Sequence, residues 1–208
     1  MSQSRIVFTL VATTVAAAAA GLSPAALAQQ AGDVMVRARA VSLKPANTDT
    51  IAITDISVNK KTIPEVDVTY FFSPSVSAEL VLTVPQKHDV SSTAHGGKIG
   101  TLKHLPPTLL AQYRFTSLGT GPVTPYVGAG INLTLFSSVN LPAGFTIDKR
   151  SIGPAYQLGA DIALGGAWSL NVDYKKVQIR TDLSSSGTNL GTIQVDPTLI
   201  GVGVGYKF

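Results

Sequence analysis

The last eight residues, Gly201 to Phe208, read GVGVGYKF. Glycine occupies positions 201, 203 and 205, and valine or an aromatic residue occupies positions 202, 204, 206 and 208. Such strict alternation is typical of a β-strand with two different faces. The alternative is a glycine-rich loop that binds phosphate, but that loop requires a helix after its glycines, and here only three residues follow Gly205. The segment therefore predicts a strand with one bare face and one apolar face.

Seven other segments alternate in the same way, and no part of the chain after residue 28 has a helical period. With 198–208 they give eight predicted strands: 33–43, 64–72, 76–84, 107–115, 123–136, 155–164, 168–180 and 198–208.

The connections between these segments alternate in length. Three are short, at 73–75, 116–122 and 165–167. Four are long and polar, at 44–62, 85–106, 137–153 and 181–196. Short turns at one end and long loops at the other are typical of barrels in the outer membrane of bacteria. The sequence therefore predicts an all-β fold, an eight-stranded antiparallel up-and-down transmembrane barrel with short periplasmic turns and long extracellular loops.

Residues 1–28 predict a secretory signal peptide. Arg5 gives a positive start, residues 6–22 are apolar, and Ala26-Leu27-Ala28 forms a cleavage site of small residues. An uncleaved anchor is the alternative, but the apolar run is slightly short for the ~20 residues of a membrane span. We expect residues 29–208 to form one domain.

The composition agrees with a membrane barrel better than with a soluble domain. Only 13% of the residues are charged, and the mean hydropathy is +0.27. Residues 29–208 nevertheless contain no run of ~18 apolar residues, the length a spanning helix needs. Cysteine is absent, so no disulfide can hold the fold. The basic residues are scattered along the sequence, and we expect no nucleic-acid partner.

The polar face of the predicted strands carries charges of both signs. Basic residues facing lipid near the middle of a bilayer would each cost about 2–4 kcal/mol, so this face is expected to line the lumen. Opposite charges can pair there as a structural network, and steering of cargo is the alternative role. Lys207 shares this face. The predicted lumen-lining residues are Arg37, Arg39, Glu65, Asp67, Glu79, Gln112, Arg114, Asp161, Asn171, Asp173 and Lys175.

Aromatic residues recur where strands reach the short-turn end. The pattern Tyr-x-Phe closes three of the strands that run in this direction, and a tryptophan opens the seventh strand. Aromatic rings at one height form the interfacial girdle of a membrane barrel. The predicted periplasmic girdle consists of Tyr70, Phe72, Tyr113, Phe115, Trp168, Tyr206 and Phe208.

Seven segments, in order along residues 34–208, are similar to the outer membrane protein W family. They are VMVRARAVSLKP (34–45), IPEVDVTYFFSPSVSAEL (63–80), KHDV (87–90), LPPTLLAQYRF (105–115), PYVGAGINLTLF (125–136), GADIALGGAWSLNVDYKKVQI (159–179) and VDPTLIGVGVGYKF (195–208). No single motif is very specific, but the ordered set is.

This resemblance implies a channel for small, mainly hydrophobic solutes. It implies that the cargo enters a partly apolar funnel from outside and leaves sideways through the barrel wall. Pro85, Pro106 and Pro107 fall at the loop ends of two strands. Prolines remove hydrogen bonds from the ladder and could leave such an opening, although ordinary strand termination explains them equally well.

Three histidines lie in or beside one long loop, at positions 88, 95 and 104. His88, Asp89 and Ser91 are the nearest approach to the Ser/His/acid set of a lipid hydrolase. Neither that set nor a metal site has convergent partners at a sensible spacing. We therefore expect no catalytic residue, no metal and no cofactor.

The leading hypothesis is a non-enzymatic channel in the outer membrane, surrounded by lipid. Its main alternative is a structural, adhesive or receptor barrel that binds a partner through loops such as 44–62 and 85–106. A soluble periplasmic ligand-binding barrel is a further alternative, and detergent-free extraction of the protein would support it.

The final residue, Phe208, resembles the aromatic residue that outer-membrane barrels present to the barrel assembly machinery. Deleting Phe208 should therefore impair insertion, measured as the amount of protein recovered in the outer-membrane fraction. Normal insertion of the shortened chain would contradict the barrel hypothesis itself.

Overall fold

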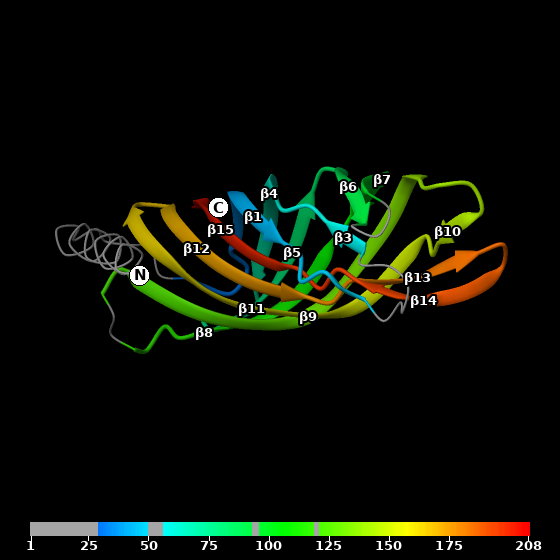
Figure 1. Cartoon of the computed structure of the whole chain (residues 1–208). Coiled ribbons are helices and arrows are strands. Elements are labelled where there is room, and N and C mark those ends of the chain that lie inside the picture. Colours follow the sequence, from blue (N-terminus) through cyan, green and yellow to red (C-terminus); the bar gives the residue numbers. More distant parts are fainter. Residues whose placement is uncertain (1–28, 50–55, 93–95, 119–120) are drawn as a thin grey trace, which may run out of the picture.

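The computed structural model describes residues 29–49, 56–92, 96–118 and 121–208. The predicted signal peptide, residues 1–28, lies outside the described residues. In the described ranges, no helix is long and apolar enough to cross a membrane. Their strands form a closed antiparallel barrel and a smaller sheet that extends beyond it (Figure 1).

Eight strands close the barrel, as predicted. In order around the wall they are β1 (Val34–Lys44), β4 (Lys61–Phe71), β5 (Val76–Thr83), β8 (Thr108–Arg114), β9 (Val123–Asn140), β11 (Arg150–Gly165), β12 (Trp168–Val177) and β15 (Thr198–Lys207). Each strand pairs antiparallel with the next, and β15 pairs back with β1. All eight overlap the segments that alternate in sequence, since the alternation reflects two faces in different surroundings. β4, β9 and β11 extend three to five residues further, into the predicted long loops.

The predicted long loops contain strands of their own. The hairpin β6 (Gln86–Ser92) and β7 (Gly97–Leu105) continues the wall along β9, and β3 (Ile56–Val58) pairs with β6. A second sheet consists of β10 (Phe145–Ile147), β13 (Arg180–Ser185), β14 (Thr188–Gln194) and β2 (Thr48–Asp49). Pairing satisfies the backbone donors and acceptors of these segments, so the extracellular end is an ordered extension of the barrel.

The closing seam between β1 and β15 depends on glycine. Gly203 lies opposite Arg39 of β1 and Asn171 of β12. A Cβ atom on Gly203 would lie 2.1 Å from the Ala38 carbonyl oxygen and 2.6 Å from Cγ of Arg39. The bare face seen in the sequence therefore gives the neighbouring arginine room to extend into the lumen.

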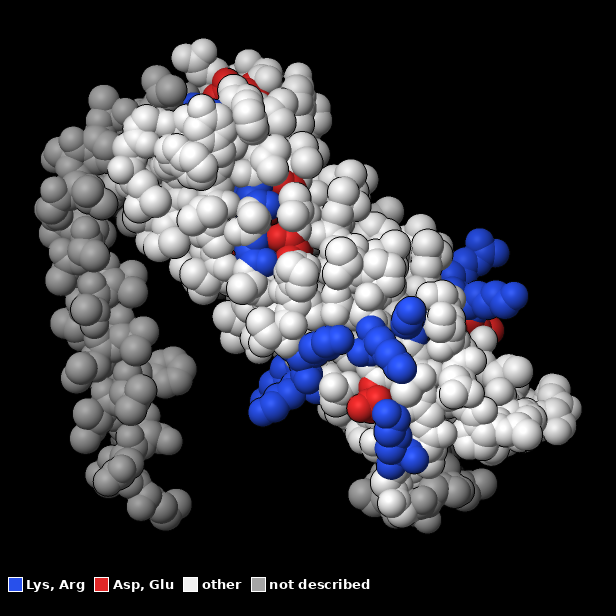
Figure 2. Space-filling model, turned by 90° about the horizontal axis from the view of Figure 1, so that it is seen from above, with Lys and Arg blue, Asp and Glu red and all other residues white. Residues whose placement is uncertain are grey.

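The two ends of the barrel differ in their outer residues. At the short-turn end, edge-to-face ring pairs join Tyr70 to Phe72, Tyr113 to Phe115 and Tyr206 to Phe208, with centroids 4.8–5.2 Å apart. Trp168 contacts Tyr206 in the same geometry. Phe208 is 73% exposed, and its backbone N–H donates to the Val34 carbonyl. Lysine and arginine instead gather at the opposite end (Figure 2).

Gly203→Ala should destabilise the barrel by roughly 1–3 kcal/mol, because the added methyl group overpacks a seam that the backbone defines. Gly201→Ala is the matched control, since its Cβ would meet only side-chain atoms, at 3.3 Å or more. Urea unfolding in lipid vesicles, followed by the fluorescence of Trp168, measures both. Equal midpoints for the two variants would contradict this account of the seam.

Candidate functional site

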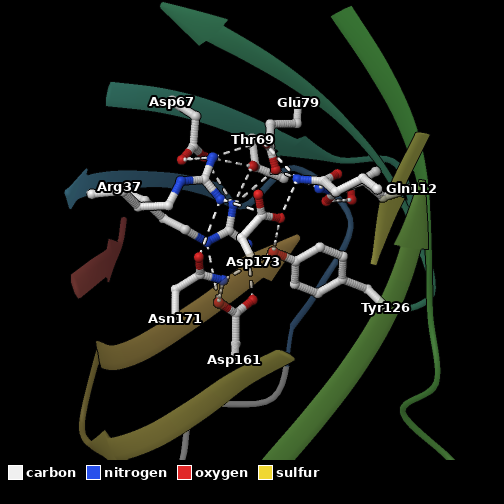
Figure 3. Close-up of polar contacts among 12 residues, drawn as sticks. Arg37, Asp67, Thr69, Glu79, Gln112, Tyr126, Asp161, Asn171 and Asp173 are labelled. Carbon is white, nitrogen blue, oxygen red and sulfur yellow. Dashed lines mark hydrogen bonds and ion pairs between the residues drawn. The ribbon is translucent and has the colours of Figure 1, made fainter. Parts of the chain in front are cut away.

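A layer of buried charges fills the lumen nearer the short-turn end (Figure 3). Its side chains extend inward from β1, β4, β5, β8, β11 and β12, so strands far apart in sequence contribute to one cluster. We call this layer the charged plug. It consists of four cations and five carboxylates, namely Arg37, Arg39, Arg114, Lys175, Glu65, Asp67, Glu79, Asp161 and Asp173, each no more than 4% exposed.

Arg37 is the most connected member of the plug on the short-turn side. Its guanidinium binds Asp161 in a two-pronged contact, with Nη2 to Oδ2 at 2.8 Å and Nε to Oδ1 at 3.1 Å. Nη1 donates to Asp67 and to Thr69, both at 2.8 Å. Charge-assisted pairs of this geometry are stronger than neutral hydrogen bonds and fix orientation. Arg114 also pairs with Asp161.

Arg39 and Lys175 form the side of the plug toward the long loops. The Arg39 guanidinium lies 2.9 Å from Glu65, 2.6 Å from Asp67 and 2.8 Å from Glu79. The Lys175 ammonium lies 2.8 Å from Glu65 and 2.7 Å from Asp173. Every charged group of the plug thus has an opposite charge in contact, which is the condition for retaining ions in a dry interior.

Neutral polar residues complete the plug. Gln112 donates to Glu79 and, at 2.8 Å, to Gln157. Gln157 in turn donates to Asp173 at 2.7 Å. The Asn171 amide donates to the Tyr126 hydroxyl, and that hydroxyl donates to Asp173, both at 3.0 Å.

The structure therefore places all of the predicted lumen-lining residues in one buried network. Lys207 lies outside it, in an ion pair with Asp33 at 3.0 Å. The prediction missed Tyr126, Gln157, Thr69 and Phe71. The alternation along each strand puts all four on the inward face, but they carry no charge, and the prediction selected mainly charged residues. The Arg114 guanidinium lies 5.0 Å and 5.3 Å from the ring centroids of Tyr126 and Phe71, within cation–π range.

Above the plug, toward the long loops, the lumen becomes apolar. Buried aliphatic residues there form the wall of an apolar funnel. They come from β1, β4, β5, β8, β12 and β15 and from the segment after β12, and we define the funnel as Val41, Leu43, Ile63, Val81, Leu110, Val177, Ile179 and Leu199. A narrow cavity of about 20 Å³ lies between the funnel and the plug. This volume holds about one water molecule. The lumen is therefore closed in this conformation.

The wall beside the funnel contains a break in its hydrogen-bond ladder. Pairing of β5 with β8 ends at Val81 and Thr108, and pairing of β6 with β7 begins at Gln86 and His104. The register pairs none of residues 82–85 with residues 105–107. This interval contains the three prolines noted in the sequence, which have no N–H to donate. Thr83 and Pro106, one on each side of the break, line the narrow cavity.

Two buried histidines lie on the β6–β7 hairpin, beyond the eight barrel strands. The rings of His88 and His104 stack with centroids 4.7 Å apart. Nδ1 of His88 contacts the Asn59 carbonyl at 3.2 Å. Burial lowers the pKa of His88, and burial with the nearby His88 and Lys61 lowers the pKa of His104 to about 3.

The structure does not assemble the residues considered for catalysis or metal binding. His88 points inward from β6, whereas Asp89 and Ser91 lie on the opposite face, and Asp89 pairs with Lys98 at 2.6 Å. His95 lies outside the described residues. The described part of the chain contains no group of three or more His, Cys, Asp or Glu residues that could hold a metal ion.

Comparisons with known proteins agree with this architecture. A model of the OmpW family matches residues 30–208. An uncharacterised outer-membrane protein of Sinorhizobium fredii, y4mB, is 35% identical over 91% of this chain and 82% of its own. PahQ of Pseudomonas aeruginosa, named as a dibenzothiophene metabolism operon protein, is 29% identical over 68% of this chain and 69% of its own. The crystal structure of the outer membrane protein OprG from P. aeruginosa aligns with a TM-score of 0.76 and 29% identity, over 86% of this chain and 97% of OprG.

Acidification should loosen the β6–β7 hairpin. The unfolded histidine binds a proton near pH 6.5, whereas His104 in the fold stays neutral until about pH 3. The unfolded state therefore binds more protons in this window, and each histidine lowers the unfolding free energy by at most about 1.4 kcal/mol per pH unit as the pH falls. Hydrogen exchange of the β6 and β7 amides, corrected for the intrinsic rate, measures the effect. In the His104→Leu variant, the exchange rates of these amides should depend less on pH. An unchanged pH dependence would show that His104 is not the group responsible.

Proposed function

The chain belongs to the OmpW family of outer-membrane proteins, and from this premise we propose that it admits small, mainly hydrophobic solutes to the outer membrane without chemical change. In this proposal a solute enters the apolar funnel from outside and passes through the break between β5 and β8 into the surrounding lipid. The observation that carries the proposal is the charged plug, which closes the lumen directly below the funnel.

The funnel offers an apolar solute a favourable surface. Its defining residues are all aliphatic, come mainly from six of the eight barrel strands and are no more than 6% exposed. Transfer of apolar surface from water to such a wall is favoured by roughly 25 cal/mol per Å². A polar or ionic solute gains nothing there and would lose its hydration.

The plug makes passage straight into the periplasm unfavourable for the same solute. Opening it requires separating carboxylates and cations that are almost fully buried, such as Arg37 from Asp161. Breaking a buried ion pair costs about 3–5 kcal/mol, because the remaining charge has no partner. An apolar solute cannot compensate that charge, which supports a sideways exit.

The break in the wall provides a route of suitable chemistry. Leu82 and Leu109 lie on the outer surface beside it, 45% and 50% exposed. A solute leaving between Thr83 and Pro106 would thus meet hydrocarbon directly, and few backbone hydrogen bonds would have to open. The similarity to PahQ, whose name links it to the metabolism of an aromatic sulfur heterocycle, supports small, apolar aromatic compounds as the cargo class.

In reconstituted liposomes, the protein should increase the flux of an aromatic hydrocarbon and leave the flux of an inorganic anion unchanged. In the variant Thr83→Cys/Pro106→Cys, a short thiol-reactive linker across the break should abolish most of the hydrocarbon flux, because it joins the two edges of the exit. Cleaving the linker should restore the flux.

The matched control is Val68→Cys/Leu80→Cys. These two residues face each other across β4 and β5, which are already hydrogen-bonded, so the same linker should have no effect. If the linked Thr83/Pro106 variant transports normally, the exit lies elsewhere, but the proposal of a channel still stands. If the wild-type protein transports no hydrocarbon, the proposal of transport is wrong.

A further inference from the structure

On several strands the outward apolar series ends in a basic residue at the extracellular end. On β12 the series Val172 and Tyr174 is followed by Lys176, and on β11 Ile152 is preceded by Arg150. The series on β1 ends in Lys44. We define the basic belt as Lys44, Lys87, Lys103, Arg150 and Lys176, which belong to β1, β6, β7, β11 and β12.

Lys87 and Lys103 form the most unusual part of the belt. They are directly opposite each other on β6 and β7, and both are exposed. Side chains in this relation have Cβ atoms about 4.5–5.5 Å apart, and like charges there destabilise the pair. Lys103 is also opposite Ser137 of β9, the residue two positions after the exposed Leu135. The lysine pair therefore lies just above the apolar surface of the wall.

A second pair of cations lies on the other side of the barrel. Lys44 of β1 and Lys176 of β12 both face Thr198 of β15, which stands between them. The Lys176 ammonium donates to the Asp196 backbone carbonyl, a contact that leaves its charge unneutralised. The belt thus contains a pair of lysines on each of two sides of the barrel.

Three of the carboxylates at this end are engaged elsewhere. Asp89 pairs with Lys98 at 2.6 Å, and Asp196 pairs with Arg180 at 3.0 Å. Asp182 accepts hydrogen bonds from Asn189 and Thr192. No ion pair joins a member of the belt to a carboxylate among the residues that the structure describes. Figure 2 shows the resulting concentration of positive charge at this end.

The belt and the aromatic girdle lie at opposite ends of one apolar surface, so the two membrane interfaces meet different chemistry. Aromatic rings suit an interface of any headgroup, whereas clustered lysine and arginine bind anionic headgroups. We propose that the basic belt binds the phosphate groups of anionic glycolipids in the outer leaflet. The proposal rests on the location in the outer membrane and is independent of the solute.

The test uses the full barrel in a zwitterionic detergent, with lipid A that carries two phosphates as the probe. Thermal unfolding should shift upward with this lipid and not with the same lipid after its phosphates are removed. Inorganic phosphate should not reproduce the shift, because the acyl chains hold the lipid against the wall. An equal shift with the dephosphorylated lipid would overturn the proposal.

The variant Lys103→Gln should change two properties in opposite directions, its stability in detergent and its affinity for lipid A. In detergent alone it should be more stable than the wild type, because the repulsion with Lys87 is removed. Its affinity for phosphorylated lipid A should nevertheless fall roughly fivefold, the contribution of one cation near a charged membrane surface. Lys44→Gln repeats the affinity measurement on the other side of the barrel.

Lys207→Gln is the matched control. It removes the same charge at the girdle end, where Lys207 pairs with Asp33. Its affinity for lipid A should equal that of the wild type. If Lys103→Gln and Lys44→Gln also keep the wild-type affinity, the belt does not bind the phosphates and the proposal is wrong.

Discussion

Closure of the wall between β1 and β15 is the constraint on which the rest of this structure depends. In a bilayer no water can satisfy backbone donors and acceptors, so a sheet that crosses it must have no free edge. Here β15 closes the sheet, and two of its three glycines lie opposite Arg37 and Arg39 of β1. A small closed barrel must fill its interior with side chains. The bare glycine face decides that these side chains can be as large as arginine.

The charged plug follows from that space. Arg37 and Arg39 extend from the seam to the centre of the lumen, where carboxylates from β4, β5, β11 and β12 surround them. Five carboxylates around four cations leave no unpaired cation in the plug, and glutamine amides and a tyrosine hydroxyl donate further hydrogen bonds to Glu79 and Asp173. Such a layer is rigid because separating any pair leaves a buried charge. It divides the lumen into a polar part and an apolar funnel.

The break in the wall beside the funnel is the second feature that matters for a solute, because the plug closes the lumen below. The ladder between these strands is interrupted over one short interval, beside the outward Leu82 and Leu109 and just below the extracellular extension. The extension then restores pairing through β6, β7 and β9. The weak point of the wall is therefore short, and strands stabilise it above and below.

Period-two alternation is a local property, so the eight strands, the two faces of each strand, the inward position of the charges and the aromatic end could all be predicted from the residues. Contacts that depend on the register between distant strands could not be predicted and come from the folded structure. Examples are the contact of Arg37 with Asp161, the place of Tyr126 in the plug and the height at which charge gives way to the funnel. The folded structure also decided that lysines scattered along the chain meet in one belt, since Lys87 and Lys103 become neighbours only when their hairpin forms. Residues on one strand share a face by geometry, whereas residues on different strands meet only where backbone pairing brings them to the same height.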